Sequence, residues 1–200
     1  MNGSFDEWLN DAFGIGENDL SPSVRFGLQS AVLTGLASMY GIPLHKLFMP
    51  SAEASSTVVT VNAMMELGDN VDYAISECEG LRRRGYDVVK IKVGRDMDPV
   101  SEAETINAIS DALHDVTMFR LDANRAWDLD EALTFALHLN HPFSCEVQYI
   151  EEPVADFNDL QAFCKDENAM PVALDETLYS IQPAELVQIL RDNEMIEIGR

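Results

Sequence analysis

Two rhythms of apolar and polar residues follow one another along the chain, and the change between them falls near residue 57. In the first part, large apolar residues recur every three to four positions, at Val24, Leu28, Val32, Leu36 and Met39. This spacing predicts an amphipathic helix that faces a core, beginning at Ser21-Pro22-Ser23 and ending before Gly41. Residues 26–44 lack charge, but polar residues interrupt them, so we expect a core helix rather than a membrane span.

From residue 57 onward, short β-branched or apolar runs alternate with longer segments of helical periodicity. The predicted strands are 57–62, 87–93, 117–121, 147–150, 172–174 and the start of a sixth at 195–198. The predicted helices are 70–84, 99–113, 129–139, 158–165 and 183–190. This alternation indicates an α/β fold with a parallel sheet and helical crossovers. An open doubly wound sheet and a (β/α)₈ barrel both satisfy it, and periodicity alone does not distinguish them.

The same patterns divide the chain into three parts. Residues 1–22 are rich in Asn, Gly and Asp, and we expect a poorly structured lead-in with a turn at Gly14-Ile15-Gly16. Residues 23–56 are expected to form the helix and a linker. Residues 57–200 are expected to form one domain of about five βα units and the start of a sixth.

Composition limits the classes of partner. The chain has 200 residues, 13 of them basic and 35 acidic, so its formal net charge is -22. This argues against nucleic acid or an anionic membrane as the main partner, because both attract Lys and Arg. The first ten residues hold Asp6 and Glu7 and no basic residue, so no targeting signal is expected there. Three cysteines, Cys78, Cys145 and Cys164, form no CxxC and favour a reducing compartment.

Ionisable residues stand at the ends of four consecutive predicted strands. They are Lys90 and Lys92, then Asp122, Glu151 and Asp175. The steps are 30 residues from 92 to 122, 29 from 122 to 151 and 24 from 151 to 175. Each step is about one βα unit, so the positions on the strands are equivalent. In parallel βα folds the carboxyl ends of the strands carry the functional groups. This placement favours the barrel, in which inward positions on neighbouring strands converge.

Three carboxylates that meet at one point repel one another, and a divalent cation removes that conflict. Oxygen ligands from carboxylates, completed by water or substrate, suit Mg²⁺. The pattern therefore predicts a metal site at Asp122, Glu151 and Asp175. The alternative is a set of strand-end caps and solvated loop acids.

The two lysines share one face of their strand, because strand side chains alternate with a period of two. If Val89, Ile91 and Val93 pack outward against helices, Lys90 and Lys92 both point into the barrel. A buried lysine near a cation can act as a base. The alternative is an edge strand with exposed lysines.

These motifs resemble those of the enolase superfamily. They are KxK, DxN, EEP and DE, at residues 90–92, 122–124, 151–153 and 175–176. The string RLDANRAW at 120–127 resembles the o-succinylbenzoate synthase family in particular, as do the segments 23–29 and 149–153. The resemblance implies a partial (β/α)₈ TIM-type barrel, the C-terminal domain of that superfamily, with most of the capping domain missing.

The resemblance also assigns roles to residues. It implies that Mg²⁺, with Mn²⁺ as a substitute, binds Asp122, Glu151 and Asp175. It implies that Lys92 is the catalytic acid and base and that Lys90 is its electrostatic neighbour. Further residues implied beside the metal or the substrate are Asn124, Glu152, Arg120 and Trp127. For Trp127, packing against the barrel mouth and contact with substrate both remain open.

The implied reaction is that of a lyase. It is the dehydration of 2-succinyl-6-hydroxy-2,4-cyclohexadiene-1-carboxylate, a small carboxylate, to o-succinylbenzoate in menaquinone or phylloquinone synthesis. In plants this activity occurs in a multidomain plastid fusion protein, which would place the chain in the chloroplast stroma; otherwise we expect the cytoplasm. Muconate cycloisomerisation, dipeptide epimerisation and N-acylamino-acid racemisation are alternative reactions of the superfamily.

The chain departs from the superfamily pattern near its end. The superfamily needs a second lysine on the sixth strand, and no lysine follows Lys165. We therefore expect a fragment of a larger synthase that is inactive alone, and a non-catalytic remnant is a further alternative.

Overall fold

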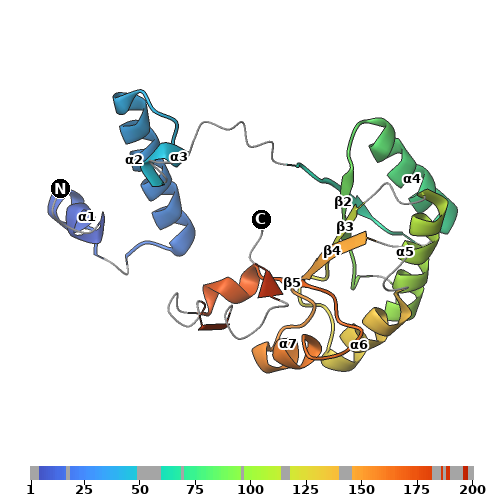
Figure 1. The fold of residues 1–200 in the computed structure, drawn as a ribbon. Coiled ribbons are helices and arrows are strands. Elements are labelled where there is room, and N and C mark those ends of the chain that lie inside the picture. The colour runs from blue at the N-terminus through green and yellow to red at the C-terminus, as the bar shows by residue number, and fades with distance from the viewer. Residues whose placement is uncertain are drawn as a thin grey trace. The chain divides into compact units, whose positions relative to one another are not determined.

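The computed structural model describes residues 5–16, 19–48, 60–68, 70–95, 97–113, 118–139, 146–181, 186, 188–189 and 196–197. The chain divides into two compact units, Met1–Val58 and Val59–Arg200 (Figure 1). The second unit holds every candidate site residue.

The first unit contains three helices, α1 (Phe5–Phe13), α2 (Pro22–Tyr40) and α3 (His45–Phe48). The expectation of a poorly structured lead-in is wrong for the residues of α1. The ring of Trp8 lies 5.6 Å from that of Phe5 and 5.5 Å from that of Phe13, measured between centroids. Aromatic contacts between successive turns outweigh the polar composition of this segment.

Helix α2 begins and ends where the sequence predicts. Pro22 occupies its first turn, and Gly41 closes it in the left-handed conformation with φ of 64°. Ala37 is buried, but two residues of the predicted core-facing stripe, Val24 and Met39, are 50% and 83% exposed. The described residues therefore do not cover that stripe. None of the described helices is both long enough and apolar enough to cross a membrane.

The second unit is built on one parallel sheet. Its strands are β1 (Ala63–Glu66), β2 (Val88–Lys92), β3 (Met118–Asp122), β4 (Glu146–Glu151), β5 (Val172–Ala173) and β6 (Ile196–Glu197). Each strand pairs in parallel with the next one in the sequence, in the order β1-β2-β3-β4-β5-β6. A doubly wound sheet reverses its strand order at a switch point, and this sheet does not. The order confirms the α/β fold and the winding of a partial TIM-type barrel.

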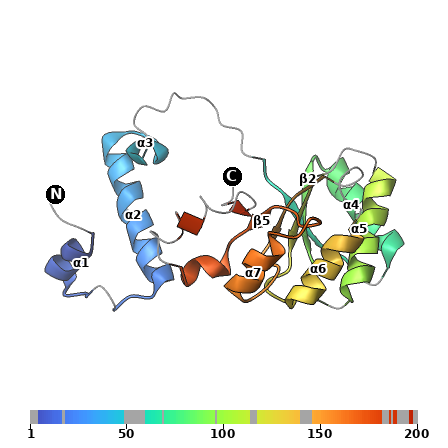
Figure 2. The ribbon, with the colours of Figure 1, turned by 60° about the horizontal axis from the view of Figure 1, so that its bottom comes forward.

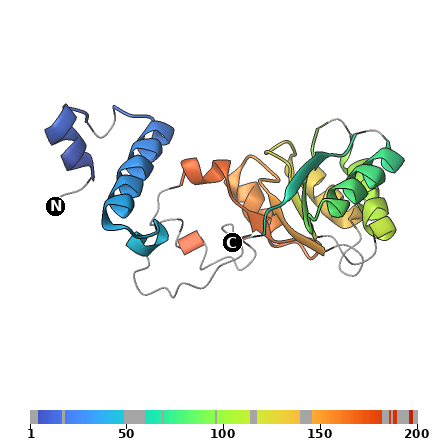
Figure 3. The same cartoon turned by 90° about the horizontal axis from the view of Figure 1, so that it is seen from above.

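Four helices cover one face of this sheet, as Figures 2 and 3 show. They are α4 (Val71–Arg83), α5 (Pro99–Leu113), α6 (Leu129–His138) and α7 (Phe157–Phe163), followed by the short 3₁₀ helix η1 (Glu176–Tyr179). Side-chain caps at Asn70, Asp128 and Asp156 accept hydrogen bonds from the first turns of α4, α6 and α7. These boundaries agree with the predicted helices to within two residues.

The first predicted strand is displaced. Residues 60–62 are not in a strand. Strand β1 begins instead at Ala63, and its residues Ala63 and Met65 are buried on the helix side of the sheet. Pairing with β2 and burial against α4 outweigh the β-branched composition of Thr60 and Val61. Residues 57–59, the linker 49–56, Cys145 and most of the predicted helix 183–190 lie outside the described residues.

The core lies between the sheet and the helices. Val89, Ile91 and Val93 of the β2 segment are at most 1% exposed and belong to the same apolar cluster as Ile106 of α5 and Phe135 of α6. Because side chains alternate along a strand, the lysines of β2 face the opposite side. The expected orientation of this strand is confirmed.

Candidate active site

Charged side chains gather on the sheet face opposite the helices, at the carboxyl end of the strands. The register pairs Lys92 of β2 with Asp122 of β3, and Asp122 with Glu151 of β4. Glu151 pairs in turn with Ala173 of β5, and Asp175 follows that strand two residues later. Lys92, Asp122 and Glu151, which follow one another at steps of about one βα unit, therefore lie at one level of the sheet.

The side chains of these residues converge. The Nζ of Lys90 donates hydrogen bonds to both carboxylate oxygens of Glu151 at 2.9 Å and lies 2.7 Å from Oδ2 of Asp122. The Nζ of Lys92 donates to the same Asp122 oxygen at 2.6 Å and to Oδ1 of Asn124 at 2.7 Å. Two ammonium groups and two carboxylates thus form one cluster, in which the Asp122 side chain is 1% exposed.

The cluster shifts the pKa values of its members. Burial raises the pKa of the Asp122 carboxyl, but hydrogen bonds from Lys90 and Lys92 outweigh burial and hold that pKa below its usual range. Burial lowers the pKa of Lys90, but its bonds to Asp122 and Glu151 prevail and raise it. The pKa of Glu151 is raised by burial first and by the charge of neighbouring carboxylates, against the opposing effect of Lys90.

The described residues contain no group of three or more His, Cys, Asp or Glu side chains already arranged to hold a metal ion. The ammonium of Lys90 occupies the position between Asp122 and Glu151 instead. The donor set nevertheless fits a hard divalent cation. Asp122 and Asp175 both raise the pKa of Glu151, and Oε2 of Glu176 is buried with no hydrogen-bond partner among the described residues. The site therefore has a carboxylate oxygen that no hydrogen-bond donor satisfies, and carboxylate oxygens are the ligands that hard divalent cations prefer.

Two other predicted residues lie beside this cluster. Asn124 accepts from Lys92, its backbone N–H donates to Asp122 at 3.1 Å, and its Nδ2 donates to Oε1 of Glu176 at 3.4 Å. Glu152 is completely buried, and it accepts a hydrogen bond from the backbone N–H of Asp175 at 2.7 Å.

Arg120 and Trp127 lie further away. Arg120 pairs with Lys90 one level below the carboxylates, and its guanidinium donates to Gln148 at 2.8 Å and to Asn62 at 3.0 Å. Trp127 is 6% exposed and stacks on Phe135 with ring centroids 4.6 Å apart. Of the two open interpretations of Trp127, the structure favours packing in the core.

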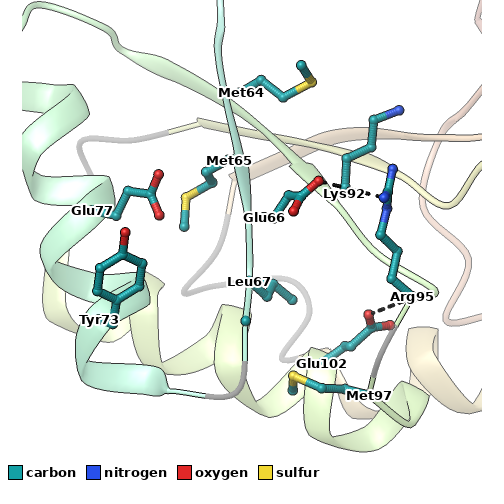
Figure 4. Close-up of a pocket in the computed structure, with 11 residues that line it drawn as sticks. Met64, Met65, Glu66, Leu67, Tyr73, Glu77, Lys92, Arg95, Met97 and Glu102 are labelled. Atoms are coloured by element: carbon teal, nitrogen blue, oxygen red, sulfur yellow. Dashed lines mark hydrogen bonds and ion pairs between the residues drawn. The ribbon is translucent and has the colours of Figure 1, made fainter.

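A cavity of about 580 Å³ borders Lys92 at the carboxyl ends of β1 and β2 (Figure 4). Its lining includes Met64, Met65, Met97, Tyr73 and Glu77. Glu66 and Arg95 form an ion pair across it at 3.6 Å, as the dashed line in Figure 4 shows. Sequence reasoning missed these residues, because they belong to no motif.

Glu102 of α5 also escaped the sequence analysis. Its side chain is 2% exposed, and both of its carboxylate oxygens accept from the N–H of Gly94, at 2.9 and 2.8 Å. Gly94 stands two residues after Lys92, so Glu102 anchors the loop that follows the lysines. An acidic residue in the first turn of a helix is the available signal, but such residues are usually exposed.

The fold and this site together define a barrel-type βα domain with carboxylates and lysines at the carboxyl ends of its strands. Residues 74–195 match the Enolase C-terminal domain-like family, which is more than half of the chain. The chain therefore belongs to that family.

Relatives of known name agree with this assignment. The chain is 34% identical over 183 residues to Protein PHYLLO, chloroplastic, of Arabidopsis thaliana, covering 89% of this chain and 10% of that protein. It is 27% identical over 180 residues to the L-Ala-D/L-Glu epimerase of Bacillus subtilis and 30% identical over 172 residues to the o-succinylbenzoate synthase of Salmonella heidelberg. Those matches cover 88% and 86% of this chain and 46% of each enzyme, so the chain spans under half of these relatives.

A solved structure shares the fold. The o-succinylbenzoate synthase of Thermosynechococcus elongatus, complexed with Mg in its active site, superimposes with a TM-score of 0.54 at 25% identity, over 75% of this chain and 47% of that one. The chain is thus a member of a family of enzymes, and a related enzyme binds magnesium.

Proposed function

We propose that this chain supplies the metal site and the acid and base of an o-succinylbenzoate synthase-type lyase. The observation that carries the proposal is the convergence of Lys90 and Lys92 with Asp122 and Glu151 at the carboxyl end of the sheet. The string RLDANRAW at residues 120–127 and the similarity to a synthase of this type support the choice of reaction.

The chemistry needs both parts of the cluster. A proton next to a carboxylate is too weakly acidic for a free amine to remove at neutral pH. A divalent cation held by Asp122, Glu151 and Asp175 supplies, when bound, positive charge that stabilises the negative charge developing on the substrate carboxylate. We assign Mg²⁺ to this role, with Mn²⁺ as a substitute.

Lys92 is the proposed acid and base. Its neutral amine takes the proton from the carbon beside the carboxylate, and the C–H electron pair forms the new ring double bond. The C–O bond on the adjacent carbon breaks, and the Lys92 ammonium returns the proton to the departing hydroxide to give water. Asn124 orients the lysine, because its Oδ1 accepts from Nζ at 2.7 Å.

Lys90 has a supporting role in this proposal. It holds Glu151 through both oxygens and also contacts Asp122, so it keeps the two carboxylates together. Hydrogen bonds to Asp122 and Glu151 outweigh burial and raise the pKa of Lys90, so we assign it no proton transfer.

The wider setting follows from the same proposal. The partner is a small carboxylate substrate, and the similarity to a much longer chloroplastic protein supports a multidomain parent in the chloroplast stroma. A cytoplasmic synthase is the alternative.

A second reaction of the family, dipeptide epimerisation, is favoured by the similarity to the Bacillus subtilis epimerase. The test supplies the full-length gene product and Mg²⁺ with the cyclohexadiene carboxylate and, separately, with L-Ala-D-Glu. Formation of o-succinylbenzoate supports the lyase, and its absence with epimerisation of the dipeptide supports the alternative. Failure of both reactions in a folded, Mg²⁺-binding protein refutes the proposed function.

A further inference from the structure

A completely buried carboxylate lies directly behind the site. Glu152 follows the last residue of β4 and is 0% exposed. Its Oε1 accepts from the backbone N–H groups of Asp175 and Thr177, both at 2.7 Å, and its Oε2 accepts from the Thr177 hydroxyl at 2.6 Å. One side chain thus binds three donors of the turn that follows β5.

Arg125 holds the same carboxylate from the other side. Its Nε donates to Oε2 of Glu152 at 3.2 Å, and its Nη2 donates to the Thr177 hydroxyl oxygen at 2.7 Å. Its backbone N–H also donates to the carbonyl of Glu152 at 2.8 Å. We call Glu152, Arg125 and Thr177 the carboxylate clasp. The clasp ties together the three loops that follow β3, β4 and β5.

The backbone around the clasp is unfavourable for residues with side chains. Among the described residues, the three non-glycine positions with positive φ are Asn124, Arg125 and Glu152, at 46°, 62° and 45°. Two of them belong to the clasp, and the third contacts Lys92. Such conformations persist only where surrounding contacts hold them, and they concentrate at functional sites. The clasp provides those contacts.

The clasp also determines where Asp175 lies. Asp175 follows a strand of two residues, so the ladder between β4 and β5 holds it only weakly. The backbone N–H of Asp175 donates to Glu152 at 2.7 Å, and this bond ties the loop to the residue that follows β4. Glu151, the neighbour of Glu152, faces the site. The two consecutive glutamates therefore have different tasks: one faces the cation position and the other fixes the next strand end.

We propose that Glu152 is a positioning residue that sets the affinity of the site for a divalent cation without touching the cation. It does so by holding the backbone of Asp175 in place beyond the end of β5, with Arg125 and Thr177 fixing the Glu152 side chain. The inference deepens the proposed function and rests on its metal site.

The test uses the full-length gene product and measures Mn²⁺ affinity by electron paramagnetic resonance, Mg²⁺ affinity by calorimetry, and amide hydrogen exchange. The variants are Glu152→Ala, Glu152→Gln and Thr177→Val. Removing a residue that orients a metal ligand typically weakens metal binding about 10- to 100-fold. We expect a loss of this size in Glu152→Ala, together with faster exchange at the amides of Asp175 and Thr177.

The other two variants separate positioning from stability. In Glu152→Gln the amide oxygen still accepts from both backbone N–H groups, so cation affinity should stay within about threefold of wild type. Thr177→Val removes the hydroxyl that donates to the carboxylate and accepts from Arg125, and it keeps the backbone N–H, so it should weaken cation binding measurably. Asn107→Ala is the control, since Asn107 is also buried and its side chain also binds a backbone group, the carbonyl of His138, between α5 and α6. It should lower the melting temperature and leave cation affinity unchanged.

The outcomes are distinct. If wild type binds no divalent cation, the proposed metal site fails, and this inference fails with it. If wild type binds and Glu152→Ala binds equally well, the positioning role is wrong and the proposed function stands. If Glu152→Ala does not fold, Thr177→Val decides, because unchanged affinity in that variant overturns the inference.

Discussion

Gly94 offers a sharp test of how the loop after the lysines is held. Its φ is +71°, and a Cβ added there would lie 2.7 Å from the Cβ of Ala126 and 3.2 Å from Nε1 of Trp127. Its backbone N–H is bound to Glu102, so the loop has little freedom to move away. We therefore expect Gly94→Ala to destabilise the second unit through two separate effects.

The two effects can be estimated separately. A left-handed backbone costs alanine about 1–2 kcal/mol relative to glycine. Overpacking against fixed atoms costs about 1–3 kcal/mol more. Together they lower the free energy of unfolding by about 2–5 kcal/mol, which at about 2 kcal/mol per molar urea lowers the urea midpoint by about 1–2.5 M.

The assay is urea unfolding followed by circular dichroism and by tryptophan fluorescence. Gly85→Ala is the matched control, because Gly85 has φ of +91° and nothing lies within 4 Å of an added Cβ. It should lose only the backbone part, about 1–2 kcal/mol. If Gly94→Ala is no less stable than Gly85→Ala, the contact with Ala126 does not limit this loop and the reasoning is refuted.

Three more predictions follow from single residues. Lys92→Ala should abolish dehydration by the full-length gene product while Mg²⁺ still binds; calorimetry and turnover measured together check this, and near-normal turnover would assign the base elsewhere. Burial raises the pKa of the Cys78 and Cys164 thiols from 9.0 to about 11, so the folded state favours the neutral thiols. Stability should therefore fall as pH rises from 9.0 to about 11, and Cys→Ala variants should lose that part of the pH dependence. Asp128→Ala should cost about 1 kcal/mol by removing the cap of α6, whereas Asp130→Ala, also in the first turn, should cost less in the same urea assay.

Much of the second unit could be predicted from the sequence because its signals are local. The helix 99–113 matches the structure residue for residue, since Pro99 marks its start and apolar residues recur on one side. The carboxylates could be placed because strand ends recur once per βα unit. The first strand was displaced because its position depends on pairing with β2, which no local pattern reports.

The site was harder to predict in its details. Lys90 and Lys92 are about 6–7 Å apart along the strand at roughly 3.3 Å per residue, so their Cα atoms lie at different levels. Their long side chains nevertheless reach the same oxygen of Asp122. Glu102 and Glu152 could not be recognised as buried anchors of backbone N–H groups in a chain with 35 acidic residues. Burial of a charge depends on tertiary partners that the sequence does not display.

The strand order β1-β2-β3-β4-β5-β6 also bears on how the site comes into being during synthesis. Each strand pairs with its predecessor, and paired residues from β1 to β5 are about 22 to 30 positions apart in the sequence. Domains emerge from the ribosome amino end first. The lysines of β2 therefore emerge before any of the acids that neutralise them, and Asp122, Glu151 and Asp175 then join one at a time. A nascent chain arrested before β3 should expose two uncompensated positive charges, and one that has reached β4 should have buried them.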